Sequence, residues 1–198
     1  MVRKHSVPGA TRTLTAISHQ GYTPQTAIAD IIDNSLAARA NDVRVTFAPQ
    51  MDQSTIVRIA DNGIGMDIDT LERAMGIGSP AEIANSQLSV YGVGMKAASL
   101  SFSRKFTVVS KRAGFEPCAA TWDMDIQDED PWAIDIDVAS DKQTKMLEAA
   151  GAAEHGTIVI WEKADFKDAV LDDRKIRGRK PSVLNVDSEV KEYLSMVF

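Results

Sequence analysis

The stretch of residues 59–67, Ile-Ala-Asp-Asn-Gly-Ile-Gly-Met-Asp, constrains the fold of this chain more than any other. It ends an apolar segment whose β-branched side chains predict a buried strand. Asp61 closes that segment, and Gly63 and Gly65 then place backbone without a Cβ beside the carboxylate. One interpretation is a purine site, because Asp61 can accept a hydrogen bond from an exocyclic amine and Met66 offers a polarizable surface to a ring. The alternative is an ordinary strand-to-loop turn, for which Asn-Gly is common.

A helix is predicted over residues 24–40. Thr23 can cap its N-terminus, and Pro24 fits the first helical position. Its apolar residues recur at helical spacing, whereas Asp30 and Asn34 are four residues apart and therefore project from one face. Two polar groups on one face beside the core suggest a binding site, and a solvated helix face is the alternative.

A second glycine-rich stretch covers residues 91–99, Tyr-Gly-Val-Gly-Met-Lys-Ala-Ala-Ser. It predicts a loop at 92–94 that leads into a helix over 95–102, whose unpaired N–H groups and positive end would face an anion. Lys96 would lie in the first turn, where a cation is disfavoured unless phosphate is near, and a lysine that extends to water is the alternative. The stretch is not a Walker A loop, which needs Gly-Lys-Ser/Thr, nor a Rossmann fingerprint, which needs a feeding strand and a third glycine.

The rest of the chain alternates between strand and helix patterns. Residues 76–91 combine glycines, a proline and small polar residues with weak periodicity, so we expect a mobile lid there. The whole pattern predicts one α+β domain, a two-layer α/β sandwich with helices on one side of a mixed, mainly antiparallel sheet. We expect a flexible lead at 1–8, helices over 9–19, 71–75, 141–150 and 186–198, and strands over 43–47, 105–111, 117–122, 132–138 and 156–161.

Composition and charge exclude several classes of function. The formal net charge is -6 over 198 residues, so the molecule as a whole does not attract nucleic acid, and we expect the basic cluster at 174–180 to be solvated. The acidic loop at 123–130 lacks the glycine and glutamate of a calcium-binding loop, and the three histidines are too scattered for a metal motif. Cys118 is the single cysteine, and neither a signal peptide nor an apolar run of roughly 18 residues is found. We therefore expect a soluble, cytoplasmic protein with no membrane partner.

Four stretches occur in an order that resembles the sequence blocks of the GHKL ATPases. This superfamily includes gyrase B subunits, heat-shock chaperone ATPases, histidine kinases, MutL proteins and microrchidia (MORC) proteins. Residues 21–38 (GYTPQTAIADIIDNSLAA), 61–66 (DNGIGM) and 91–99 (YGVGMKAAS) are most similar to the MORC and MutL branch, and the strand that begins at Gly156-Thr157 completes the set. The resemblance runs over nearly the whole chain. It implies the GHKL (Bergerat) ATP-binding fold and one domain over residues 1–198, forming the N-terminal part of a longer protein.

The resemblance also implies a role for each site residue. Asp61 would bind the adenine amine, with Thr157 supporting it through water, and Asn34 would ligate Mg²⁺. Asp30 stands where most of the family has the glutamate that orients and deprotonates the attacking water. The remaining residues would shape the base pocket or hold the phosphates beneath the lid: Gly63, Gly65 and Met66 for the base, and Gly92, Val93, Gly94, Met95 and Lys96 for the phosphates.

The implied function is Mg²⁺-dependent ATP binding and slow hydrolysis, which would drive lid closure and formation of a homodimer, with DNA or protein partners engaged through further domains. We expect slow hydrolysis because Asp30 is one methylene shorter than glutamate. In addition, Ala37 stands where many relatives carry an acid, and these 198 residues do not include the domain that supplies a γ-phosphate lysine in MutL and gyrase relatives. An ATP-binding switch or scaffold without significant turnover is the alternative. A histidine kinase catalytic domain fits less well, because such relatives space the acid and the asparagine one residue further apart.

Overall fold

The computed structural model describes residues 2–5, 22–52, 54–76, 89–125, 133–164, 166, 191, 192 and 195. Its elements are, in chain order, β1 (Val2–His5), α2 (Pro24–Ala37), β2 (Val43–Pro49), β3 (Thr55–Asp61), α3 (Ile68–Met75), α4 (Ser89–Phe102), β4 (Lys105–Lys111), β5 (Cys118–Asp123), β6 (Ala133–Val138), α5 (Asp141–Ala149) and β7 (Gly156–Ala164).

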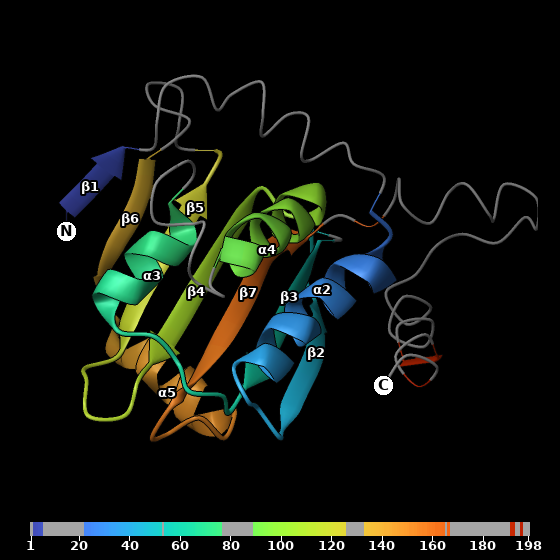
Figure 1. Ribbon diagram of the computed structural model, residues 1–198. Coiled ribbons are helices and arrows are strands. Elements are labelled where there is room, and N and C mark those ends of the chain that lie inside the picture. Colours follow the sequence, from blue (N-terminus) through green and yellow to red (C-terminus); the bar gives the residue numbers. More distant parts are fainter. Residues whose placement is uncertain are drawn as a thin grey trace, which may run out of the picture.

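One sheet of seven strands forms the first layer, in the order β1-β6-β5-β4-β7-β3-β2. The six described pairings are all antiparallel. Helices α2, α3 and α4 form the second layer across one face of the sheet (Figure 1). The expected two-layer α+β sandwich is therefore confirmed.

The core lies between the sheet and these three helices. Successive strand residues point to opposite faces, so alternate side chains such as Phe106, Trp122 and Trp161 are fully buried under the helices. Ala97 and Ala98 of α4 are also buried, and such small side chains let the helix lie close to the strands. This packing fixes α2 and α4 above the sheet, which is what positions the site.

The opposite face of the sheet has a smaller apolar cluster beneath α5. Leu147 of α5 packs there with Val109, Ile158 and Ile160 from the central strands. The expectation that all helices lie on one side of the sheet is therefore wrong for α5. This helix begins after Ser140, whose side chain forms a capping box at its N-terminus.

Most predicted boundaries differ from the structure by a few residues, and two predictions differ in the kind of element. Val2–His5, expected in a flexible lead, forms β1 and pairs with β6, because the edge of β6 offers unpaired backbone groups. Helix α4 begins at Ser89, so residues 92–94 are helical and not a loop before the helix. Two glycines lower helix propensity by about 1 kcal/mol each, but the buried face of α4 outweighs that loss. Several expectations concern residues outside those described: the helix at 9–19, residues 77–88 of the lid expected at 76–91, residues 126–130 of the acidic loop, the basic cluster at 174–180 and most of the helix at 186–198.

Candidate functional site

A row of four side chains crosses one end of the sheet beneath the helices. Asp61 of β3 is paired with Thr157 of β7, Thr157 with Ser110 of β4, and Ser110 with Cys118 of β5. Directly paired residues point to the same face, and all four are buried on the helix side. The row therefore forms a polar floor at one end of a sheet face that is mainly apolar.

Asp61 is held in place by hydrogen bonds although it is only 7% exposed. The Ser35 hydroxyl of α2 donates to Asp61 Oδ2 at 3.0 Å, and the Gly63 amide donates to Asp61 Oδ1 at 2.8 Å. Burial raises the pKa of the Asp61 carboxyl, while hydrogen bonds from Gly63, Ser35 and the Thr157 backbone act in the opposite direction. These three hydrogen bonds leave about one of the four lone-pair sites of the carboxylate, so the group can still accept from a ligand donor.

At Gly63 and Gly65 the backbone after Asp61 is packed too closely for a side chain. A Cβ on Gly63 would lie 2.8 Å from the Ala38 Cβ. Gly65 has a φ of +64°, and its Cβ would lie 1.7 Å from the Lys111 carbonyl oxygen. Gly65 is thus required by the fold itself, whatever else it contacts.

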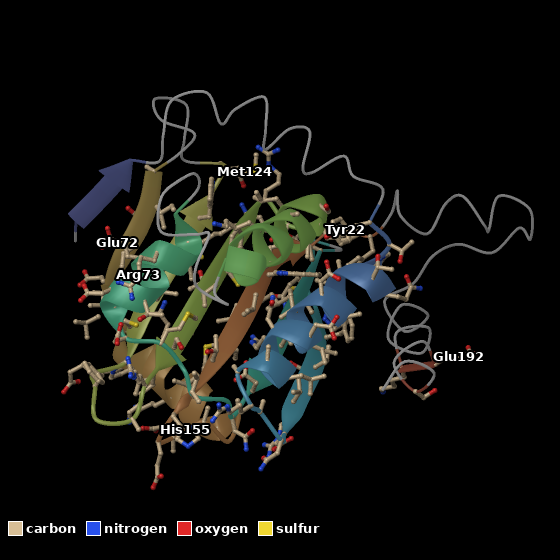
Figure 2. All side chains as sticks on the ribbon, viewed as in Figure 1. Tyr22, Glu72, Arg73, Met124, His155 and Glu192 are labelled. Atoms are coloured by element: carbon tan, nitrogen blue, oxygen red, sulfur yellow. The ribbon has the colours of Figure 1, made fainter. Side chains whose placement is uncertain are left out.

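His155 connects this turn to the strand that carries Thr157. Its Nδ1 lies 2.7 Å from the Gly63 carbonyl oxygen, which can only accept, so Nδ1 carries the proton. Figure 2 shows His155 at the end of the molecule where α5 lies. The loop before β7 therefore supports the turn that follows Asp61.

Ser110 joins three parts of the site through one hydroxyl. Its Oγ accepts from the Met66 amide at 2.8 Å, lies 2.8 Å from Thr157 Oγ1 and donates to the Gly156 carbonyl at 3.1 Å. Cys118 Sγ lies 3.6 Å from the Met66 carbonyl, so Met66 is held on both sides of its backbone. The sequence alone did not point to Ser110 or Cys118. The available signal was a serine at 110 in register with the buried positions 106 and 108.

Asp30 points from α2 toward α4 and accepts one hydrogen bond from the residues that the structure describes. The Tyr22 hydroxyl donates to Asp30 Oδ2 at 2.7 Å, and a Cβ on Gly94 would lie 4.0 Å from the same oxygen. Tyr22 lies at the N-terminal end of α2 beside α4 (Figure 2). Burial, followed by the Asp30 hydrogen bond and charge, raises the pKa of Tyr22 to about 12. Tyr22 was also missed, because it precedes the helix and helical spacing does not place it.

Asn34 shares the face of α2 that carries Asp30, one turn further along. It is half-buried, and its side chain makes no hydrogen bond within the part of the chain that the structure describes. An amide oxygen of this kind fits Mg²⁺, which takes few protein ligands and completes its shell with water and phosphate oxygens. The described residues hold no cluster of three or more His, Cys, Asp or Glu that could bind a metal alone. Asn34 therefore fits a magnesium ion that arrives with phosphate.

Lys96 does not lie in the first turn of its helix. It is about two turns into α4, only 3% exposed, and its ammonium donates to the Gly76 carbonyl at the end of α3. Burial lowers the pKa of Lys96 to about 8. The N–H groups of α4 without a helical partner belong instead to residues 89–91; Gly92, Val93, Gly94 and Met95 lie further inside the helix.

These elements define a class: a two-layer α+β domain with a buried acid at a strand end, faced by a helix that carries a second acid and an asparagine. A profile of the family described as "Histidine kinase-, DNA gyrase B-, and HSP90-like ATPase" matches residues 22–157, which is more than half of the chain. The chain belongs to this family of ATPases.

A curated relative supports the MORC resemblance. The chain is 28% identical over 97 residues to "ATPase morc-1" of Caenorhabditis elegans, an alignment that covers 49% of this chain and 11% of the relative. The chain thus spans only about a tenth of that protein's length.

Among the described helices, none has the length and apolar character needed to cross a membrane.

Proposed function

We propose that this chain binds ATP with Mg²⁺ between its helices and its sheet and hydrolyses the ATP slowly. The observation that carries the proposal is the buried Asp61 carboxylate, held at the end of β3 by Ser35 and the Gly63 amide, in a chain of an ATPase family. A buried acid with a spare lone pair suits the amino group of adenine. Thr157 would assist through water, and Gly63, Gly65 and Met66 would border the base.

The reaction would take place between α2 and α4. Asp30 would accept a proton from a water molecule as the water oxygen attacks the γ-phosphorus. The bond from that phosphorus to the bridging oxygen breaks, ADP leaves with the electron pair, and inorganic phosphate is the second product. Asn34 would ligate Mg²⁺, which when bound neutralises phosphate charge, and Gly92, Val93, Gly94, Met95 and Lys96 would contact the phosphates.

Turnover and binding can be measured separately on the purified chain. We expect Mg·ATP turnover that Asp30→Ala abolishes while a non-hydrolysable analogue still binds, and we expect Asp61→Asn to abolish binding of the analogue. Asp33→Ala is the matched control, because Asp33 lies on the same helix but is exposed. Turnover that survives Asp30→Ala, or analogue binding that survives Asp61→Asn, would show that these roles are wrong.

An ATP-binding switch with negligible turnover is the second candidate. It is favoured by Asp30 itself, whose side chain is one methylene shorter than glutamate. Analogue binding without turnover would select this candidate over the enzyme.

The proposal extends to what ATP binding would drive. Closure of residues 76–91 over the nucleotide and formation of a homodimer would follow binding, as population shifts coupled to the nucleotide. We propose residues 1–198 as one ATP-binding domain whose DNA or protein partners would engage other parts of a longer protein. A mass measurement by light scattering, with and without the analogue, tests dimerisation. The cytoplasmic location stays a prediction.

A further inference from the structure

We propose that Tyr22 is a positioning residue for hydrolysis, fixing the Asp30 carboxylate so that one of its oxygens faces the attacking water. The inference rests on the proposed function, because it concerns the same reaction. Tyr22 touches neither the nucleotide nor the water in this proposal and acts only through Asp30.

The hydrogen bond between Tyr22 and Asp30 is short and joins residues that are not neighbours in the helix. The Tyr22 hydroxyl lies 2.7 Å from Asp30 Oδ2, at a separation of eight residues, and the bond is partly buried. Thr23 lies between Tyr22 and the helix, and its capping box with Thr26 fixes the direction in which the chain enters α2. The cap therefore sets where the phenol lies relative to the carboxylate.

Tyr22 remains the hydrogen-bond donor of this pair over the usual pH range. The pKa of Tyr22 is raised to about 12, so the phenol keeps its proton and donates. A phenol that stays protonated cannot act as the base itself. It occupies one lone pair of Oδ2 and leaves Oδ1 free of that bond.

A shorter acid needs this support more than a glutamate would. The Asp30 side chain reaches less far from α2, so a rotated carboxylate would point its lone pairs away from the space beside Gly94. Among the described residues, only Asp30 Oδ2 comes within 4 Å of a Cβ placed on Gly94, at 4.0 Å, so this space borders the carboxylate directly. Displacement of a catalytic group by about 1 Å can cost on the order of a hundredfold in rate. A single hydrogen bond that prevents rotation can therefore have a large effect on kcat.

The test is Tyr22→Phe, which removes the hydroxyl and keeps the ring. We expect kcat for Mg·ATP to fall about tenfold, with KM and the Kd of a non-hydrolysable analogue changed less than about twofold. Thr107→Val is the matched control. It removes a hydroxyl that is bonded to Thr121 Oγ1 at 3.0 Å on the face of the sheet away from α2, and we expect wild-type kcat.

Different outcomes separate the two proposals. If the wild-type chain turns over ATP, Asp30→Ala abolishes turnover and Tyr22→Phe keeps or raises kcat, the role of Tyr22 is wrong and the ATPase proposal stands. The role is also wrong if kcat, analogue affinity and thermal midpoint all fall together, because Tyr22 would then be merely structural. If the wild-type chain shows no turnover, the ATPase proposal fails and the role of Tyr22 fails with it.

Discussion

Asp61→Asn replaces a buried carboxylate by a neutral amide of the same shape, and we expect it to stabilise the nucleotide-free chain at neutral pH. The new side chain can keep the existing contacts. Its oxygen can accept from the Gly63 amide, and its NH₂ group can donate to Ser35, whose hydroxyl can turn to the Ile31 carbonyl at 3.2 Å. The substitution therefore removes a buried charge and keeps a partner for both the Gly63 amide and the Ser35 hydroxyl.

The expected gain in stability is the small difference between two opposing free energies. A buried ion costs several kcal/mol of lost hydration, and hydrogen bonds to a charged group return about 1.5–3 kcal/mol each. Because burial outweighs the hydrogen bonds in the pKa of Asp61, we expect the variant to gain on the order of 1 kcal/mol in free energy of unfolding. In a chain of this length that gain raises the thermal midpoint by about 2–4 °C.

The raised pKa of Asp61 sets the direction in which its contribution to stability changes with pH. The folded-state pKa of Asp61 is raised, so between the unfolded value of about 3.9 and the folded value the folded chain binds more protons than the unfolded chain. The stability contributed by this group is therefore highest below the unfolded pKa and falls as the pH rises through the folded pKa. The gain from Asp61→Asn should be small near pH 4 and reach its full size toward neutral pH.

Urea unfolding of both chains across this pH range measures the effect. Asp33→Asn is the matched control, because it makes the same change in net charge at an exposed position on α2. A variant that loses stability at neutral pH, or that follows the control at every pH, would refute the reasoning. The same variant should lose ATP binding, since stability and function make opposite demands on a buried acid.

Three further substitutions test the site's framework by thermal or urea unfolding. Gly65→Ala should lower the free energy of unfolding by at least about 2 kcal/mol, because the added Cβ meets a backbone carbonyl. The control is Gly114→Ala, at a φ of +82° with open space around it, which should lose only about 1 kcal/mol. Equal losses in the two variants would contradict the packing argument. Ser110→Ala should lower the free energy of unfolding by about 1–3 kcal/mol, because the Met66 amide loses its hydrogen-bond partner, and it should weaken nucleotide binding. The control Thr107→Val should leave nucleotide binding unchanged. Lys96→Met should raise the free energy of unfolding by up to about 3 kcal/mol at pH 7, because it removes a buried charge. The folded-state pKa of Lys96, about 8, is below the unfolded value, so the cost of burying the charge is complete below pH 8. The gain should therefore shrink as the pH rises toward 10.

Local chemistry made much of the fold and part of the site predictable from the sequence. Thr23 and Pro24 mark the start of α2 because capping and the proline N1 preference depend only on neighbouring residues. The spacing of Asp30 and Asn34 places them on one face for the same reason. The strand ending at Asp61 followed from its β-branched residues and the turn after it.

The rest depends on contacts between distant segments. The row that adds Ser110 and Cys118 to Asp61 is set by strand order and register, which a strand pattern does not specify. The Tyr22 bond depends on how the chain enters α2. The early start of α4 is a case in which packing outweighs the low helix propensity of glycine.

Asp61 and Lys96 present the same energetic problem with opposite charges. Both are almost fully buried, and in both burial shifts the pKa toward the neutral form, so the nucleotide-free fold is penalised at each position. Neither has a partner of opposite charge among the described ion pairs. A single ligand that brings hydrogen-bond donors to one position and negative charge to the other would offset both penalties. ATP has that pattern, with an amino group on its base and charge on its phosphates, so the proposed function gives one reason for two costly residues that the fold alone does not require.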